Sequence, residues 1–231
     1  MSYNYYPQPK QRSPLFASFA HAPATAIIIA ACVIVWVATM LIPELYSYVA
    51  LSAAAGALEP WRFITSAFAH STGLLHIGSN MFVLWMVGQQ LEPLLGRGRF
   101  VGLYLLSAFG GGVAWVLLAN PQSQGWYSGV VGASGAVFGL FGAVLVLQRV
   151  VGRSSRQLIG LLLINAMIAF LVPSIAWQAH VGGLVVGAAC AAAMVGPIQK
   201  RKPGQASIGL IVIAVALVAT LAAKYIMVGA W

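Results

Sequence analysis

The segment SGAVFGLFGAVLVL, residues 134–147, has no polar side chain after its first residue and is followed by Arg149. Gly135, Gly139 and Gly142 recur within it at spacings of four and three. This spacing places the three glycines on one face of an α-helix. A face of small residues lets two membrane helices approach closely. The segment therefore predicts one helix of a tightly packed membrane bundle.

The composition of the whole chain agrees with this prediction. Of its 231 residues, 61% are hydrophobic and 6% are charged, whereas a soluble domain carries roughly 25% charged residues. Several apolar runs approach or exceed about 18 residues, the length typical of a membrane-spanning helix. The first run follows a polar stretch of about 23 residues and does not have the flanks of a cleaved signal peptide. We predict an all-α, polytopic membrane protein.

Seven apolar runs predict seven membrane helices. They lie at Ala24–Ile42, Leu75–Leu91, Phe100–Ala119, Ser134–Leu147, Leu158–Val172, Ala176–Val195 and Ala206–Ala223. The corresponding organisation is a cytoplasmic polar tail (residues 1–23), a six-helix core (24–198), a basic linker (199–205), and a seventh helix with the C-terminus (206–231).

The basic residues set the predicted orientation. Ten of the twelve fall on one side of the membrane in this arrangement, and only Arg62 and Lys224 fall on the other. An excess of Lys and Arg marks the cytoplasmic side, so we expect the N-terminus inside and the C-terminus outside. Clustering between apolar runs favours this topological role over nucleic-acid binding. The ten are Lys10, Arg12, Arg97, Arg99, Arg149, Arg153, Arg156, Lys200, Arg201 and Lys202.

Three of the predicted helices carry polar residues near their outer ends. His76 and Asn80 share one face of the second helix, Ser134 begins the fourth, and His180 lies in the sixth. Ser134 precedes Arg149 by 15 residues, which is about 22 Å of helix in a hydrocarbon core about 30 Å thick. Ser134 is therefore expected roughly 8 Å below the outer surface, at about the level of the other three residues.

Glycines indicate how Ser134 and His180 could meet. Gly183 and Gly187 lie on the face of His180, and Gly135 and Gly139 lie on the helix that Ser134 begins. Packing of these two small-residue faces would bring the serine within reach of the histidine. A lone membrane serine usually only bonds a carbonyl one turn back. The coincidence of depth, spacing and residue type favours a functional site instead.

The acidic residues restrict what chemistry this pair could perform. The chain contains no aspartate, and its three acids are Glu44, Glu59 and Glu92. None of them is expected on a helix at the level of His180. A Ser–His–Asp triad is thus excluded, and a serine hydrolase built on these residues would use a Ser–His dyad.

Four strings in order resemble the rhomboid family of intramembrane serine proteases. They are WRFITSAFAH, HIGSN, GASG and AHVGGLVVG, and they extend over Trp61 to Gly187. The resemblance implies that Ser134 is the nucleophile and His180 its general base. It also implies that His76, Asn80 and the backbone N–H of Ser134 form an oxyanion hole, with Gly132 leaving room beside it.

The resemblance also assigns structural residues. Trp61 and Arg62 match the family's W-R motif, and Glu92 matches its glutamate at the inner end of the second helix. The family's E-x-R string is E-P-L here, so we expect Arg97 or Arg99 to be the partner of Glu92. Phe138 replaces the tyrosine that often follows the serine by four residues; it can stack on the histidine but cannot donate a hydrogen bond.

Together these observations predict a serine endopeptidase that cleaves single-span membrane proteins near the outer side of the bilayer, without a metal or other cofactor. A bacterial inner membrane is the expected location. The alternative is a non-enzymatic membrane protein, either a transporter or an inactive relative that binds transmembrane segments. Both the serine and the histidine are present, which argues against the inactive relative. No internal repeat is evident, which argues against the transporter.

The fifth helix is the predicted route of substrate entry. Its 15-residue apolar run, ended by Pro173, spans about 22 Å and is shorter than the hydrocarbon core of about 30 Å. Phe170 and Leu171 at its outer end form the candidate gate. The alternative is that this helix is only a short, lipid-facing span.

Overall fold

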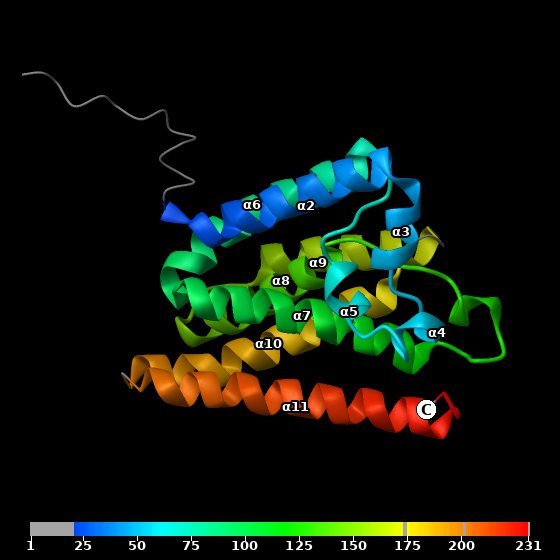
Figure 1. The fold of residues 1–231 in the computed structure, drawn as a ribbon. Coiled ribbons are helices and arrows are strands. Elements are labelled where there is room, and N and C mark those ends of the chain that lie inside the picture. The colour runs from blue at the N-terminus through cyan, green and yellow to red at the C-terminus, as the bar shows by residue number, and fades with distance from the viewer. Residues whose placement is uncertain (1–20, 173–174, 201, 231) are drawn as a thin grey trace, which may run out of the picture.

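The computed structural model describes residues 21–172, 175–200 and 202–230. Within these ranges the chain folds into helices (Figure 1), and the one β-type pairing is an isolated antiparallel bridge between Leu51 and Val130. The all-α prediction is confirmed. Most of the predicted tail, together with Pro173, Ser174, Arg201 and the side chain of Phe170, lies outside the described part.

Seven long helices follow the seven predicted runs to within a few residues. They are α2 (Pro23–Leu41), α6 (Leu74–Leu95), α7 (Arg97–Leu118), α8 (Ser134–Val150), α9 (Arg156–Leu171), α10 (Trp177–Gln199) and α11 (Pro203–Met227). Among the described residues, α2, α7, α10 and α11 are long and apolar enough to cross a membrane. Helices α8 and α9 are apolar but shorter, and α6 carries His76, Asn80 and Glu92.

The connection between α2 and α6 contains three short helices that the sequence did not predict. They are α3 (Pro43–Val49), α4 (Ala53–Gly56) and α5 (Arg62–Thr65). Arg62 holds this connection together: its buried guanidinium donates to the carbonyl oxygens of Ser47 and Ala50 and pairs with Glu59. A guanidinium presents five N–H donors in a fixed fork, so one side chain can fix several turns. Trp61 precedes α5 and is half exposed.

Glu92 joins the start of α2 to the end of α6. Its carboxylate accepts the backbone N–H groups of Ala24 (2.9 Å) and Thr25 (2.8 Å) and the Thr25 hydroxyl (2.8 Å). The first N–H groups of a helix lack partners within it, and a buried carboxylate satisfies them here. The expectation that Arg97 or Arg99 would pair with Glu92 is therefore corrected. Arg99 donates to the carbonyl of Leu95 instead.

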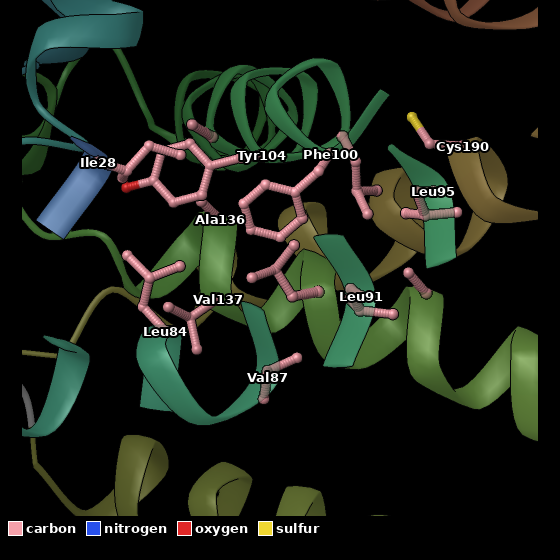
Figure 2. Packing of buried hydrophobic residues seen from close by; sticks show 14 of the residues in the cluster. Ile28, Leu84, Val87, Leu91, Leu95, Phe100, Tyr104, Ala136, Val137 and Cys190 are labelled. Atoms are coloured by element: carbon pink, nitrogen blue, oxygen red, sulfur yellow. The ribbon is translucent and has the colours of Figure 1, made fainter. Parts of the chain in front are cut away.

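The main core lies where α6, α7, α8 and α10 meet. Figure 2 shows Leu84 and Leu91 of α6 beside Phe100 and Tyr104 of α7, with Val137 and its neighbours of α8 filling the remaining space. Tyr104 is fully buried, and its hydroxyl donates to the carbonyl of Ala67 in the segment between α5 and α6 (3.2 Å). The core therefore also fixes the irregular outer segment that leads into α6.

Helices α8 and α10 touch through their backbones. A Cβ atom added to Gly183 would overlap the carbonyl oxygen of Gly135, and one added to Gly187 would overlap that of Gly139. The same holds for Gly142 against the carbonyl of Leu184. No side chain larger than hydrogen fits at these positions, so the glycines set the distance between the two helices.

Replacement of Gly183 by Val should therefore separate α8 from α10. We expect a loss of stability of about 1–3 kcal/mol, the usual cost of overpacking, measured as a lower melting temperature in detergent. Gly196→Val is the matched control on the same helix, because a Cβ there has no neighbour within 4 Å. Equal melting temperatures for the two variants would contradict close backbone packing.

Candidate active site

Ser134 and His180 lie in hydrogen-bond contact at the N-terminal ends of two packed helices. Ser134 is the first residue of α8, and His180 lies in the first turn of α10. The distance from Ser134 Oγ to His180 Nε2 is 2.8 Å. The glycine contacts further along α8 and α10 hold the two helices close enough for this hydrogen bond.

The histidine ring is held by stacking. Phe138, one turn beyond Ser134, lies parallel to the His180 ring, with a centroid separation of 4.3 Å and an interplanar angle of 8°. The buried Nδ1 atom of His180 has no hydrogen-bond partner among the described residues. Two of the three acids are engaged elsewhere: Glu59 pairs with Arg62, and Glu92 binds the start of α2. The site thus orients its histidine by an aromatic face.

At Gly132 the backbone passes close to both the His76 ring and the Ser134 hydroxyl. Its φ angle is +131°, a conformation that side chains disfavour, and its N–H donates to the carbonyl of Ser66 (2.9 Å). A Cβ on Gly132 would lie 2.9 Å from His76 Nε2 and 3.7 Å from Ser134 Oγ. Only glycine leaves this space open, and the ring nitrogen of His76 faces it.

Ser71 determines which nitrogen of His76 can donate. The Ser71 backbone N–H donates to His76 Nδ1 (3.3 Å), and the Ser71 hydroxyl lies 2.7 Å from the same atom. Because Nδ1 accepts a hydrogen bond from an N–H group, the proton of a neutral ring sits on Nε2. Nε2 is therefore a donor aimed at the space beside Gly132. Ser71 could not be predicted as a site residue, because a serine in a polar connection carries no distinctive signal.

His70 supports the residue before the serine. Its Nε2 accepts the backbone N–H of Ala133 (3.3 Å), and its Nδ1 lies 3.3 Å from the carbonyl of Phe68. Burial, reinforced by the nearby His76, lowers the pKa of His70 to about 4, so the ring is neutral and can accept. His70 was also missed as a site residue, although it ends the WRFITSAFAH string.

Ser71, His76, Ser134 and His180 line a cavity of about 630 Å³. Asn80 is buried and donates one amide N–H to the carbonyl of His76 (2.8 Å). An amide carries two N–H donors, so the second can serve a ligand in the cavity. From α9, Leu161 and Asn165 line the cavity, whereas Leu171 is 73% exposed. The lining also includes Asn80 and Phe138.

The start of α8 has no side-chain cap. Its N-cap residue is Ala133, whose side chain has no polar atom to accept the N–H groups of the first turn. The first turn of α8 therefore directs free N–H groups toward the same region as Ser134 Oγ.

Comparison with known proteins gives a consistent answer. The family model for the rhomboid domain matches residues 57–197. Rhomboid protease GlpG of Salmonella typhi is 30% identical over 193 residues, which cover 78% of this chain and 67% of the relative. Rhomboid protease GluP of Bacillus subtilis is 33% identical over 144 residues, covering 59% of this chain and 26% of the relative.

RHOMBOID-like protein 5 of Arabidopsis thaliana is 35% identical over 136 residues, covering 56% of this chain and 42% of the relative. The chain thus spans less than half the length of the GluP and Arabidopsis relatives. The family model matches more than half of the chain, across the residues that build the cavity. The chain belongs to the rhomboid family.

Proposed function

We propose that this protein is an intramembrane serine endopeptidase that cleaves transmembrane-anchored proteins near the outer side of the bilayer. The observation that carries the proposal is the 2.8 Å contact between Ser134 Oγ and His180 Nε2 at the edge of a cavity large enough for a peptide backbone. The similarity to two proteins named rhomboid proteases adds support.

In the proposed reaction, Ser134 Oγ attacks the carbonyl carbon of the scissile peptide bond while His180 Nε2 takes the hydroxyl proton. The histidine then delivers this proton to the leaving amine, and water hydrolyses the acyl-enzyme by the same route. The absence of aspartate from the chain and the stacking of His180 on Phe138 favour a dyad. Phe138 would hold the orientation of the imidazole ring by stacking on it. In a Ser–His–Asp triad a carboxylate has this role.

The tetrahedral intermediate places a negative charge on the former carbonyl oxygen. We assign its stabilisation to His76 Nε2–H, the free amide N–H of Asn80 and the backbone N–H of Ser134. Donors of this kind act mainly in the transition state, where charge develops. Ser71 would contribute indirectly, by holding the proton of His76 on Nε2.

The charge distribution supports an orientation with the N-terminus in the cytoplasm. Ser134 and His180 then lie toward the outer face, and water enters the cavity from outside. A bacterial inner membrane is the location that we propose.

The dyad is tested by replacing Ser134 or His180 with Ala. Each change should lower the cleavage rate of a single-span substrate by at least about 10³-fold, because neither residue activates the reaction alone. A serine-directed fluorophosphonate should label the wild-type protein and not the Ser134→Ala variant. Melting temperatures should stay close to that of the wild type.

The same experiment separates the proposal from its rivals. A transporter, or a relative that only binds transmembrane segments, would show neither cleavage nor labelling of Ser134. Full activity in either alanine variant would rule out the dyad.

The oxyanion assignment predicts a kinetic signature for His76→Ala. The turnover number should fall about 10- to 100-fold with little change in KM; removal of one such donor in a soluble serine protease costs about 2.7–4 kcal/mol, and here several donors share the role. Ser71→Ala should show a smaller effect of the same kind. Ser128→Ala is the control, since its hydroxyl bonds only to the Gln124 carbonyl in its own loop. An unchanged turnover number with a raised KM would assign His76 to substrate binding instead.

We also propose that the substrate helix enters between α6 and α9, with the outer end of α9 yielding. Leu163, Ile164 and Met167 of α9 are more than half exposed, so few packing contacts hold this helix in place. Leu161 and Asn165 of α9 form part of the cavity wall. Displacement of α9 would thus open the cavity sideways to lipid.

This route predicts that a thiol cross-link between cysteines introduced at Ser79 and Leu171 slows cleavage of a transmembrane substrate by at least about fivefold, since a tethered helix moves little on the time scale of lid opening. Phe170→Ala should raise the rate. Cleavage of a short soluble peptide, which enters through the aqueous opening, is the internal control. If the cross-linked protein cleaves both substrates at the uncross-linked rates, entry occurs elsewhere.

A further inference from the structure

One face of the outer end of α11 is buried, although most of this helix is not. Val212, Val215 and Val218 are about 60% exposed, in keeping with a helix at the edge of the bundle (Figure 1). Leu221 and Tyr225, which follow Val218 by one and two turns, are buried. Helix α11 also lies beyond residue 197, where the match to the family model ends. Its outer end therefore has contacts that the shared core does not explain.

Tyr225 binds the connection between α2 and α6. Its hydroxyl donates to the carbonyl oxygen of Ala53 at the start of α4 (3.0 Å). The fit is close, because a Cβ added to Gly56 of the same short helix would lie 2.7 Å from the Tyr225 oxygen. The Tyr225 ring meets the edge of Trp126 at 81° and 6.3 Å between centroids. One side chain of α11 thus contacts both outer connections of the active-site region.

Lys224 fixes the same end of α11 to α7. Its ammonium donates to the carbonyl oxygens of Leu117 and Ala119 (both 3.2 Å), where α7 ends. The ammonium also lies 5.9 Å from the centre of the Trp126 ring. The last carbonyls of a helix lack partners within it, so a cation is a favourable cap there. Lys224 and Tyr225 together define what we call the outer clamp.

A short series of backbone contacts connects the outer clamp to the proposed nucleophile. Ala53 follows Leu51 by two residues, and Leu51 pairs with Val130 through two backbone hydrogen bonds (3.1 and 2.7 Å). Val130 precedes Gly132 by two residues, and Gly132 faces His76. Leu51, Val130 and Ser134 also border one small cavity of about 40 Å³.

Both connections need this support. Residues 119–133, from the C-cap of α7 to the start of α8, contain only the short helix η1 (Gln124–Trp126), and the connection after α2 contains helices of four to seven residues. Segments of this length without a core of their own are commonly mobile. Here Leu51, Ala53, Phe63 and Trp126 share a second hydrophobic cluster with Tyr225 and Leu221. Helix α11 contributes part of the core that these connections lack.

We propose that the outer clamp positions the segment from Val130 to Ser134, and that Tyr225 and Lys224 are positioning residues for cleavage. The inference rests on the proposed function of Ser134 and adds a role for the seventh helix. It acts through a defined route: the clamp holds α4, α4 holds Leu51, and the bridge of Leu51 to Val130 holds the backbone beside Gly132.

The test compares Tyr225→Phe with Tyr48→Phe in the full-length protein. The first change removes only the hydroxyl that binds Ala53, and the second removes a hydroxyl from an exposed ring. Loss of one buried hydrogen bond should raise amide hydrogen exchange at Leu51 and Val130 about fivefold to tenfold. Exchange in the inner half of α2 should not change. The value of kcat/KM for a transmembrane substrate should fall by a similar factor, while the melting temperature shifts little.

Lys224 supplies a second pair of variants. Lys224→Met should reproduce the exchange and kinetic effects, and Lys224→Arg, which keeps a cation near the end of α7, should restore most of the wild-type behaviour. Gly56→Ala should impair the wild type more than it impairs the Tyr225→Phe variant. The Tyr225 oxygen is the nearest of the three atoms that the Cβ would meet (2.7 Å, against 2.9 Å for Phe63 and 3.1 Å for Leu51), and it is absent in that variant. This non-additivity is the sign of direct contact.

Unchanged exchange at Leu51 and Val130 in Tyr225→Phe would overturn the proposal. So would a uniform rise in exchange throughout the protein, since the helix would then only add general stability. Hydrogen exchange requires no catalysis, so this readout remains valid if fluorophosphonate fails to label Ser134. That second outcome would overturn the proposed function and leave the structural role of the clamp to be judged by exchange alone.

Discussion

Backbone contact between α8 and α10 is the constraint on which the rest of the site depends. Helices that carry ordinary side chains pack with their axes about 8–10 Å apart, and association within lipid favours small residues that permit a closer approach. Here Gly183 and Gly187 lie directly on the carbonyls of Gly135 and Gly139. That approach places the first residue of one helix beside the first turn of the other. The Ser134–His180 contact follows from this close approach of α8 and α10, and no further contact is needed to bring the two side chains together.

Much of this arrangement could be predicted because it follows from periodic or compositional signals. Apolar runs located the seven long helices, and the glycine spacing indicated which faces would meet. The depth of Ser134 in the membrane, inferred from the count to Arg149, stays a prediction. Each of these signals belongs to a regular helix, whose geometry fixes where every residue points.

The unpredicted parts belong to irregular backbone. The three short helices after α2 are held by Arg62, whose partners are carbonyl oxygens up to 15 residues away. Glu92 binds the start of a helix, through two backbone N–H groups and the Thr25 hydroxyl, and not an arginine. Sequence spacing suggests which side chains can pair, but it does not reveal which backbone groups lack partners until the fold is known. His70 and Ser71 could not be predicted for the same reason. Each forms hydrogen bonds with backbone or ring atoms that only the fold brings near.

The bare start of α8 has an electrostatic consequence. Peptide dipoles aligned along a helix give its N-terminus a partial positive charge of roughly half an elementary charge, and Ala133 supplies no group to neutralise it. Such a terminus is a ready-made site for an anion. A negative charge formed beside Ser134 would therefore be the missing cap of α8. Because α8 begins at Ser134, its positive end lies at the wall of the same cavity that His76, Asn80 and His180 line.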